Sequence, residues 1–413
     1  MLVRQIKNEE LLAARRVSSV AFNWGLDDQG QAPEEFSLAA MAQPKTRMEA
    51  EPSNIWAAFT EEGEMTSVMG VAPYQVYFDG NKVPMGGIAE VGTLPMYRRT
   101  GGIRAIFGKV LPHLYEQKVP VSFLYPFSEA FYRKFGYERS AQNRQWLLDL
   151  KALPEFDYTP YGEIKMCRTP EDQEQAKEAY EMFASRHNLC ISREKFDWAA
   201  FNGTDPFKNT KYLYSFVTKE GKCTGYIVFQ VIWENGVRVM DTPELVFADI
   251  TALRALLELS RRFNGSYAFM RVKLPDTVNL DFFITDYAKT GSKVEAMRQL
   301  GMARVTNVPE VLRLARYQGC GSLSIQIADN MIEAQNKVYT VEFADGKAVN
   351  VTEQEIGSVK ADVEMGIGLF SSAMMGALTV AEMEYRPEII WNCEPEKAAG
   401  VFYKKSNWLN NFF

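Results

Sequence analysis

The 413-residue chain has little of what marks disulfide-rich or metal-binding proteins. Its five cysteines are scattered and none forms a C-x-x-C pair, which favours reduced thiols over a disulfide framework or a zinc site. The only two histidines, His113 and His187, fall on separate predicted helices without ligand spacing to a second histidine or a cysteine. We therefore expect no bound metal.

Targeting and membrane segments are not expected either. The first residues, MLVRQIKNEELLAARR, contain no apolar run, so we expect no signal peptide. Residues 365–381 carry no charge, but they are short for a bilayer span and rich in glycine and serine, which favours a buried helix or turn. The net charge of -6 argues against nucleic-acid binding and suits a cationic substrate. We expect a cytoplasmic protein that binds neither membrane nor nucleic acid.

Length and composition indicate several domains. A chain of 413 residues exceeds what one compact core supports, so two or three domains are expected. Hydrophobic residues make up 46% and charged residues 24%, which is ordinary for a globular protein. Aromatic residues make up 13%, a high share that predicts well-filled cores.

Two successive segments repeat the same predicted order of elements, an α/β pattern. The first has strands at 1–6, 54–59, 66–78, 87–94 and 121–125 and helices at 8–21, 103–117 and 128–136. A linker rich in proline and tyrosine covers 153–161. The second has strands at 164–168, 212–219, 224–233 and 267–274 and helices at 171–186 and 248–263. This repetition predicts an internal duplication. A third region begins near residue 302 with a strand, a helix capped by Asn307 and a hairpin over Asp345-Gly346.

The main chemical signal is GGIAEVGTLPMYRRTGGIRAIFGKVL, residues 86–111, which predicts a strand, a basic glycine loop and a helix. Helix N-termini present unpaired amides and the positive end of the dipole, and arginines at 98, 99 and 104 add charge. This combination suits a pyrophosphate, although a plain turn is the alternative. The segment is neither a G-K-[ST] phosphate loop nor a G-x-G-x-x-G dinucleotide motif.

The context of this loop resembles the GNAT acetyltransferases. A strand follows the loop and helix, and then the segment FSEAFYRKFGYERS, residues 127–140. Arg98-Arg99-Thr100-Gly101-Gly102-Ile103 matches the R-x-x-G loop of that superfamily, with Ile103 where most members have glycine or alanine.

The whole chain resembles the Eis (enhanced intracellular survival) family of aminoglycoside N-acetyltransferases more specifically. The resemblance rests on VGTLPMYRRTGGIRAIF, on SEAFYRKFGY, and on the length with a C-terminal phenylalanine. It implies an α/β (α+β) fold with tandem GNAT-like domains, the first at 1–152 binding acetyl-CoA and a degenerate one at 153–290. A sterol-carrier-like domain with a catalytic C-terminus would occupy 291–413. It also implies a homo-oligomer, in this family a hexamer.

The resemblance also assigns roles to individual residues. Tyr132 matches the proton donor, and the terminal carboxylate of Phe413 matches the proton acceptor. The residues that match acetyl-CoA contacts are Val91, Gly92, Thr93, Arg99, Thr100, Gly101, Gly102, Ile103, Arg104, Ser128 and Glu129. The second domain has no R-x-x-G loop, so we expect no acetyl-CoA there.

These roles are chemically consistent with transfer to an amine. The amine must lose a proton before it attacks a thioester, and the departing thiolate must gain one. A phenol of pKa about 10 can supply that proton to a thiol of pKa about 8.5. Tyr132 as a core residue, and residues 412–413 as an apolar plug, remain alternatives. The acceptor stays open among aminoglycoside-like, polyamine and lysine amines, and a lipid- or small-ligand-binding carrier without catalysis is the alternative function.

Overall fold

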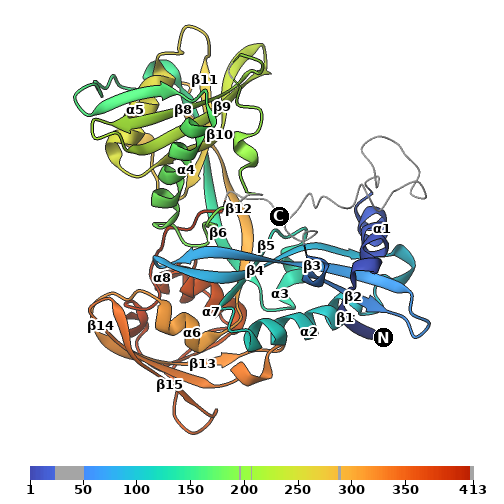
Figure 1. Ribbon diagram of the computed structural model, residues 1–413. Coiled ribbons are helices and arrows are strands. Elements are labelled where there is room, and N and C mark those ends of the chain that lie inside the picture. Colours follow the sequence, from blue (N-terminus) through green and yellow to red (C-terminus); the bar gives the residue numbers. More distant parts are fainter. Residues whose placement is uncertain (24–50, 195–196, 206, 287–289, 410–413) are drawn as a thin grey trace.

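The computed structural model describes residues 1–23, 51–194, 197–205, 207–286 and 290–409 (Figure 1). Its strands form one sheet of twelve and one sheet of five. The large sheet runs through two units that follow each other in sequence, and the small sheet belongs to a third unit.

In the first unit, α1 and α2 cover opposite faces of the sheet. α1 packs against β3 and β4 on one face, and α2 packs across β1 to β4. Its elements are β1 (Leu2–Gln5), α1 (Leu11–Phe22), β2 (Ile55–Phe59), β3 (Met65–Phe78), β4 (Asn81–Thr93), α2 (Gly102–Glu116), β5 (Val121–Leu124), α3 (Glu129–Arg133) and β6 (Glu138–Asp149).

The second unit repeats this order. In both units an antiparallel three-stranded meander leads through a helix to a strand that pairs in parallel with the meander's last strand. The elements are β7 (Gly162–Met166), α4 (Pro170–Ala184), β8 (Lys211–Thr218), β9 (Cys223–Glu234), β10 (Val237–Phe247), α5 (Ile250–Arg261), β11 (Phe269–Pro275) and β12 (Lys293–Val305). Thr169 and Asp172 cap the start of α4 reciprocally, as serine or threonine and an acidic residue do at this spacing. The predicted internal duplication is thus visible in the order of elements.

The two units exchange their last strands. The order in the large sheet is β1-β2-β3-β4-β5-β12-β6-β11-β10-β9-β8-β7. β12, from the end of the second unit, lies antiparallel between β5 and β6 of the first, and β6 lies between β12 and β11. Figure 1 shows β6 and β12 running side by side from the second unit at the top toward the lower half of the molecule. Neither unit completes its part of the sheet alone.

The third unit packs its helix α7 against this junction. α7 contacts β12 and β6 of the large sheet as well as β13 and β16 of its own. The elements are α6 (Val308–Leu314), β13 (Gly321–Ala328), β14 (Val338–Ala344), β15 (Lys347–Gln354), β16 (Val363–Gly366), α7 (Ile367–Met374), α8 (Val380–Met383) and β17 (Ile390–Trp391). The uncharged stretch at 365–381 is thus largely a buried helix and the turn after it.

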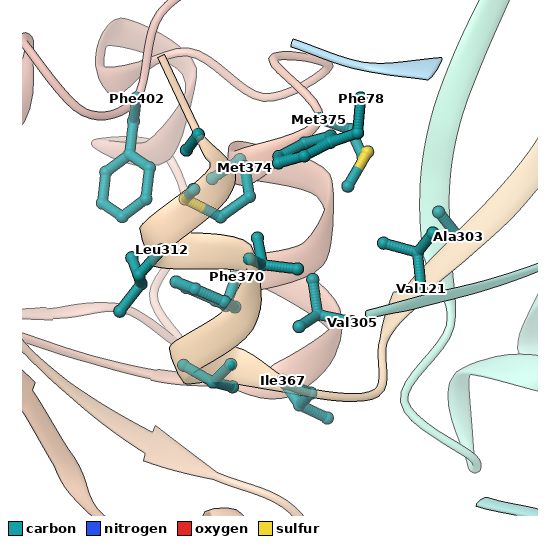
Figure 2. Close-up of a cluster of buried hydrophobic side chains, with 14 of the residues drawn as sticks. Phe78, Val121, Ala303, Val305, Leu312, Ile367, Phe370, Met374, Met375 and Phe402 are labelled. Atoms are coloured by element: carbon teal, nitrogen blue, oxygen red, sulfur yellow. The ribbon is translucent and has the colours of Figure 1, made fainter. Parts of the chain in front are cut away.

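One hydrophobic core joins the first and third units. Figure 2 shows Phe78 of β3, Val121 of β5 and Val305 of β12 close to Phe370 and Met375 of the α7 region. All five side chains are fully buried. Burial of apolar surface on this scale is the main favourable term in folding, so these two units are expected to stabilise each other.

Candidate functional site

β4 separates from β5 partway along its length. The two strands pair in parallel from Met85 opposite Val121 to Ile88 opposite Leu124. β4 also pairs with β3 from Asn81 to Thr93, and beyond Ile88 a bulge interrupts that pairing where Glu90 has a φ of 49°. The predicted residues 91–93 follow this bulge. Their edge away from β3 is not bonded to another strand of the described chain, so it can offer backbone groups to a ligand.

The loop after β4 is tightly shaped. The Thr100 hydroxyl donates to the carbonyl of Tyr97 at 2.7 Å, which closes the turn. Arg99 and Gly101 both have left-handed backbone, with φ of 68° and 93°. Glycine adopts this conformation without penalty, so Gly101 suits the position directly before the helix.

The start of α2 presents unpaired backbone donors. Its first internal hydrogen bond runs from the amide of Ala105 to the carbonyl of Gly101, at 2.9 Å. The amides of residues 102–104 precede that bond and have no acceptor in the described part of the chain, as expected for a helix N-terminus. Arg99 and Arg104 are exposed beside them. Amides, dipole and guanidinium groups therefore combine in one anion-binding position.

Ser67 of β3 joins the strand end to this helix. Its hydroxyl accepts a hydrogen bond from the Thr93 hydroxyl at 3.0 Å, and the residue is fully buried. A Cβ on Gly102 would lie 2.4 Å from the Ser67 hydroxyl oxygen, so Gly102 is needed for this close approach. The sequence analysis missed Ser67, because a single serine inside a strand carries no motif.

Tyr132 on α3 packs against α2. The Phe107 ring meets the Tyr132 ring edge-on with 6.3 Å between centroids, and it stacks on Phe135 at 4.2 Å. The Arg104 guanidinium lies 5.7 Å from the centre of the same Phe135 ring. The anion-binding loop and the predicted proton donor therefore belong to one continuous cluster of side chains.

The Tyr132 side chain is 3% exposed, and burial raises its pKa above the usual value for a phenol. Its hydroxyl has no hydrogen-bond partner among the residues that the structure describes. The phenol is thus protonated across the neutral range, as a proton donor must be.

Ser128 and Glu129 serve α3 itself. The Ser128 hydroxyl caps the helix by accepting from the amide of Phe131 at 3.4 Å. The Glu129 carboxylate accepts from Arg133 at 3.3 Å and from Arg139 at 2.8 Å. Their predicted contact with acetyl-CoA stays a prediction.

Ser122 connects β4, β5 and the segment after α3. Its hydroxyl donates to the carbonyl of Gly86 at 2.7 Å and lies 2.7 Å from the Tyr137 hydroxyl. Both residues are fully buried. This bridge fixes the distance between the parallel strands just before they separate. The sequence analysis also missed it, since the three residues lie on different elements.

The C-terminal segment enters the junction of all three units. The Asn407 amide donates to the carbonyls of Ser140 and Met375, both at 2.8 Å. The Asn143 amide donates to the carbonyl of Leu409 at 3.4 Å. Leu409 is 1% exposed and packs in the same core as Tyr74 and Phe123 of the first unit. Residues 410–413, which include the predicted proton acceptor Phe413, lie outside the described residues.

The matching place in the second unit is occupied by its own side chains. β10 has a bulge at the position that corresponds to the bulge of β4, but it contains Pro243, which lacks an amide hydrogen. Asp249 caps α5 by accepting from the amide of Ala252 at 2.8 Å, so a carboxylate stands where the first unit gathers positive charge. Arg193 and Glu244, each with a side chain 2% exposed, form an ion pair nearby.

Within the described ranges, the remaining reactive side chains form no second centre of this kind. The five cysteines are unpaired. His113 packs beside Trp56, and the Nδ1 of His187 lies 2.7 Å from the Ser406 hydroxyl. Across the residues that the structure describes, there is no group of three metal-binding side chains. None of the helices in the same residues is long and apolar enough to span a bilayer.

Comparison with known proteins places this geometry in a family context. Residues 2–140 match the family model of the acetyltransferase (GNAT) domain, and residues 308–410 match that of the sterol carrier protein domain. The chain is an acetyltransferase with a GNAT domain. The GNAT domain at the N-terminus and the sterol carrier domain near the C-terminus follow the order that the Eis resemblance implied.

Solved structures resemble the whole acetyltransferase chain in fold. A GCN5-related N-acetyltransferase from Anabaena variabilis superposes with a TM-score of 0.81 at 19% identity, with both chains fully covered. Eis1 from Mycobacterium abscessus gives 0.80 at 17% identity, also over both full chains. A probable N-acyltransferase from Enterococcus faecalis gives 0.79 at 21% identity, covering 98% of this chain and 97% of the other. No curated protein sequence matches the chain. The predicted resemblance to Eis proteins is thus confirmed in domain content and fold.

Proposed function

We propose that this acetyltransferase moves the acetyl group of acetyl-CoA directly to an amine in its first unit. The main observation behind the proposal is that three structural features lie together in one cluster of side chains. These are the strand-free edge of β4 after Ile88, the basic N-terminus of α2, and the buried phenol of Tyr132. Each feature meets one requirement of acetyl transfer: holding the thioester arm, holding its phosphates and returning a proton.

The residues present fit acetyl-CoA. The three amides at the start of α2 would donate to pyrophosphate oxygens, and Arg99 and Arg104 would supply charge. The β4 backbone at Val91 and Thr93 would bind the extended arm as a neighbouring strand binds. When bound, acetyl-CoA supplies the thioester that is cleaved. The second unit would not bind it, because Pro243 and Asp249 stand at the corresponding positions.

Tyr132 would return the proton to the departing thiolate. Burial raises the pKa of the phenol, which keeps it protonated, and its hydroxyl is not engaged by another described residue. General acids of this kind contribute about 100-fold or more to the rate.

The terminal carboxylate of Phe413 would accept the proton of the amine. Leu409 is buried in the core that contains Phe123 on β5, the strand that borders the site. Four further residues can extend at most about 14 Å from there. A carboxylate is a weak base for a free ammonium, but it can hold the ammonium and receive its proton in a dry pocket.

Each of the three predicted domains would have its own role. Residues 1–152 would bind acetyl-CoA, 153–290 would form the degenerate GNAT-like unit, and 291–413 would form the sterol-carrier-like domain. β12, which begins at Lys293, lies within the last of these ranges but belongs to the large sheet of the first two units. The acceptor would be an aminoglycoside-like, polyamine or lysine amine, in keeping with the net charge of -6. The cytoplasmic location and the hexamer implied by the Eis resemblance stay predictions.

The match to a sterol carrier protein domain favours ligand carriage as the second candidate function. Against it, α7 packs its apolar side chains into the core shared with the large sheet, where Phe370 and Met374 are fully buried (Figure 2). A helix used in this way supports the acetyltransferase unit rather than enclosing a ligand.

A thiol-release assay tests the proposal. The protein is incubated with acetyl-CoA and a panel of kanamycin, spermidine and a lysine peptide, and free CoA is measured by mass spectrometry. A thiol dye would also react with exposed Cys320. We expect amine-dependent release, and Tyr132→Phe should lower kcat by about 100-fold while leaving the Kd for acetyl-CoA unchanged. Absence of release with every amine would favour the carrier function, and full kcat in the variant would reduce Tyr132 to a packing residue.

A further inference from the structure

A fully buried ion pair joins the large sheet to the third unit. Arg304 lies on β12 opposite Ser122 of β5, and Asp329 directly follows β13. One terminal nitrogen of Arg304 donates to both carboxylate oxygens of Asp329, at 2.7 and 2.6 Å. Both side chains are 0% exposed. Such a pair is costly to bury, so its arrangement is held strictly by its surroundings.

The same guanidinium group holds the turn that follows α3. Its other terminal nitrogen donates to the carbonyl of Phe135 at 2.6 Å. The amide of Phe135 in turn donates to the carbonyl of Tyr132 at 2.9 Å. Arg304 therefore connects Asp329 of the third unit to the backbone turn that begins at Tyr132.

The residues after Asp329 reinforce this turn. The Asn330 amide donates to the carbonyl of Lys134 at 3.1 Å. Ile332, 3% exposed, packs in the same hydrophobic cluster as Tyr132 and Phe135. The segment 329–332 is thus linked to α3 and the turn after it through Arg304, a hydrogen bond and a shared hydrophobic cluster.

α3 needs such external support. A helix of five residues is far too short to be stable by itself. No hydrogen bond within the described chain fixes the Tyr132 hydroxyl, so the position of its oxygen follows from the α3 backbone and the surrounding rings. A shift of about 1 Å in such a group can cost up to about 100-fold in rate.

We propose that Arg304, fixed by Asp329 and assisted by Asn330, is the positioning residue for Tyr132, and that the sterol-carrier-like domain serves catalysis through this contact. The inference rests on the proposed role of Tyr132 as proton donor. A purely structural ion pair would change stability alone, whereas a positioning pair changes kcat at constant affinity for acetyl-CoA.

Arg304→Lys is the first test. The ammonium keeps the charge beside Asp329 but cannot reproduce the fixed fork that also reaches the carbonyl of Phe135. We expect kcat to fall about tenfold or more, with an unchanged Kd for acetyl-CoA by calorimetry. The matched control is Arg271→Lys, because Arg271 also donates to both oxygens of a carboxylate, that of Glu295, but in the second unit. Its kcat should equal that of the wild type. Wild-type kcat in Arg304→Lys would overturn the inference.

The double variant Arg304→Lys/Tyr132→Phe separates this inference from the proposed function. If Arg304 acts through Tyr132, the double variant is no slower than Tyr132→Phe, because no donor remains to be positioned. If the decreases in kcat of the two single variants multiply in the double variant, Arg304 acts elsewhere. That result would overturn the inference while leaving Tyr132 as donor. Full kcat in Tyr132→Phe alone would overturn both.

Asn330→Ala keeps the test decisive if Arg304→Lys does not fold. Asn330 is exposed, and the substitution removes only its hydrogen bond to Lys134. A decrease in kcat of about twofold to fivefold with unchanged melting temperature is expected for the weakened end of α3. Unchanged kcat in folded Asn330→Ala together with an unfolded Arg304→Lys would overturn the positioning role.

Discussion

Gly136 must be a glycine for two reasons: its backbone is left-handed, and the side chain of Arg304 packs directly against its Cα. Its φ is 78°, and a Cβ there would lie 1.9 Å from a terminal nitrogen of Arg304 and 2.6 Å from the side chain of Ile367. The glycine of the F-G-Y segment is therefore required by an arginine 168 residues later in the sequence. The motif could be recognised from the sequence, but this reason for it could not.

Gly136→Ala is expected to weaken both stability and turnover. The left-handed backbone costs an alanine about 1–2 kcal/mol, and displacement of Arg304 adds to it. We expect a lower melting temperature and reduced kcat by the thiol-release assay. Gly108→Ala is the control, because nothing lies within 4 Å of a Cβ there and alanine favours a helix interior. A Gly136→Ala protein with wild-type melting temperature would contradict the geometry at this turn.

The arginines of the loop govern cofactor affinity. Arg99→Ala/Arg104→Ala should weaken acetyl-CoA binding by about 2–6 kcal/mol, since hydrogen bonds to charged groups contribute about 1.5–3 kcal/mol each and exposure moderates them. Titration calorimetry at two salt concentrations measures this loss. Lys109→Ala, which removes an exposed charge from the same helix, should bind normally. Equal affinities in the double variant and the control would refute the loop assignment.

At the scale of elements, the amphipathic and turn-bounded segments were predictable and the polar central strands were not. The helix predicted at 103–117 is α2, and Thr169 caps α4 as expected. β6 and β10 were missed because they carry buried polar residues. Gln145 of β6 donates to Glu295 on β12, and Glu244 of β10 pairs with Arg193. Because these polar residues are buried with partners from distant segments, the strands lack the alternation of apolar and polar residues by which strands are recognised in a sequence.

The α4 end and the C-terminal segment share a titratable contact. His187 follows α4, and burial, together with the nearby Arg186, lowers its pKa to about 4. The next residue, Asn188, exchanges backbone hydrogen bonds with Ser406 and Trp408. This histidine is therefore neutral in the folded protein at neutral pH and lies beside the segment that leads to the terminus.

Acid is expected to destabilise the protein through His187. Between pH 6.5 and about 4 the unfolded chain binds a proton at this residue and the folded chain does not. The contribution of His187 to stability is therefore full above about pH 6.5 and decreases as the pH falls toward 4, by at most about 1.4 kcal/mol per pH unit. His187→Gln should flatten the decrease in melting temperature between pH 7 and 4.5, and His113→Gln should not. Identical profiles for both variants would show that the acid sensitivity arises elsewhere.

At the scale of the whole molecule, the exchange of β6 and β12 makes the units interdependent. The duplication could be predicted from the order of elements. The exchange could not, because pairing between strands 150 residues apart leaves no local signal. β12 lies between β5 and β6, and α7 covers both β12 and β6. The site is thus completed by residues from the second and third parts of the chain.

A fragment of residues 1–152 should therefore fail to fold independently. Without β12, the facing edges of β5 and β6 lose their common neighbour, and buried polar groups such as those of Ser140 and Asn143 face solvent or remain unpaired. We expect no cooperative unfolding transition by circular dichroism and no acetyl-CoA binding. The full chain measured alongside should show both. A sharp transition in the fragment would mean that the first unit is autonomous.

The C-terminal segment is held by contacts with all parts of the molecule, and its terminal carboxylate is the proposed base. Trp408 and Leu409 are buried, and Asn143 and Asn188 bind their backbone, so the chain is anchored up to four residues from its end. If the Phe413 carboxylate accepts the proton of the amine, one added glycine converts that carboxylate into a neutral amide and moves the new charge by about 3.5 Å. A base must lie within about 3 Å of its proton, or one water away, so kcat/KM should fall by about 100-fold or more. Because residues 408 and 409 keep their contacts, the melting temperature should stay the same.

A protein with one extra N-terminal glycine is the matched control for the C-terminal extension. Equal kcat/KM for the two proteins, at equal melting temperature, would assign the base to an internal carboxylate instead.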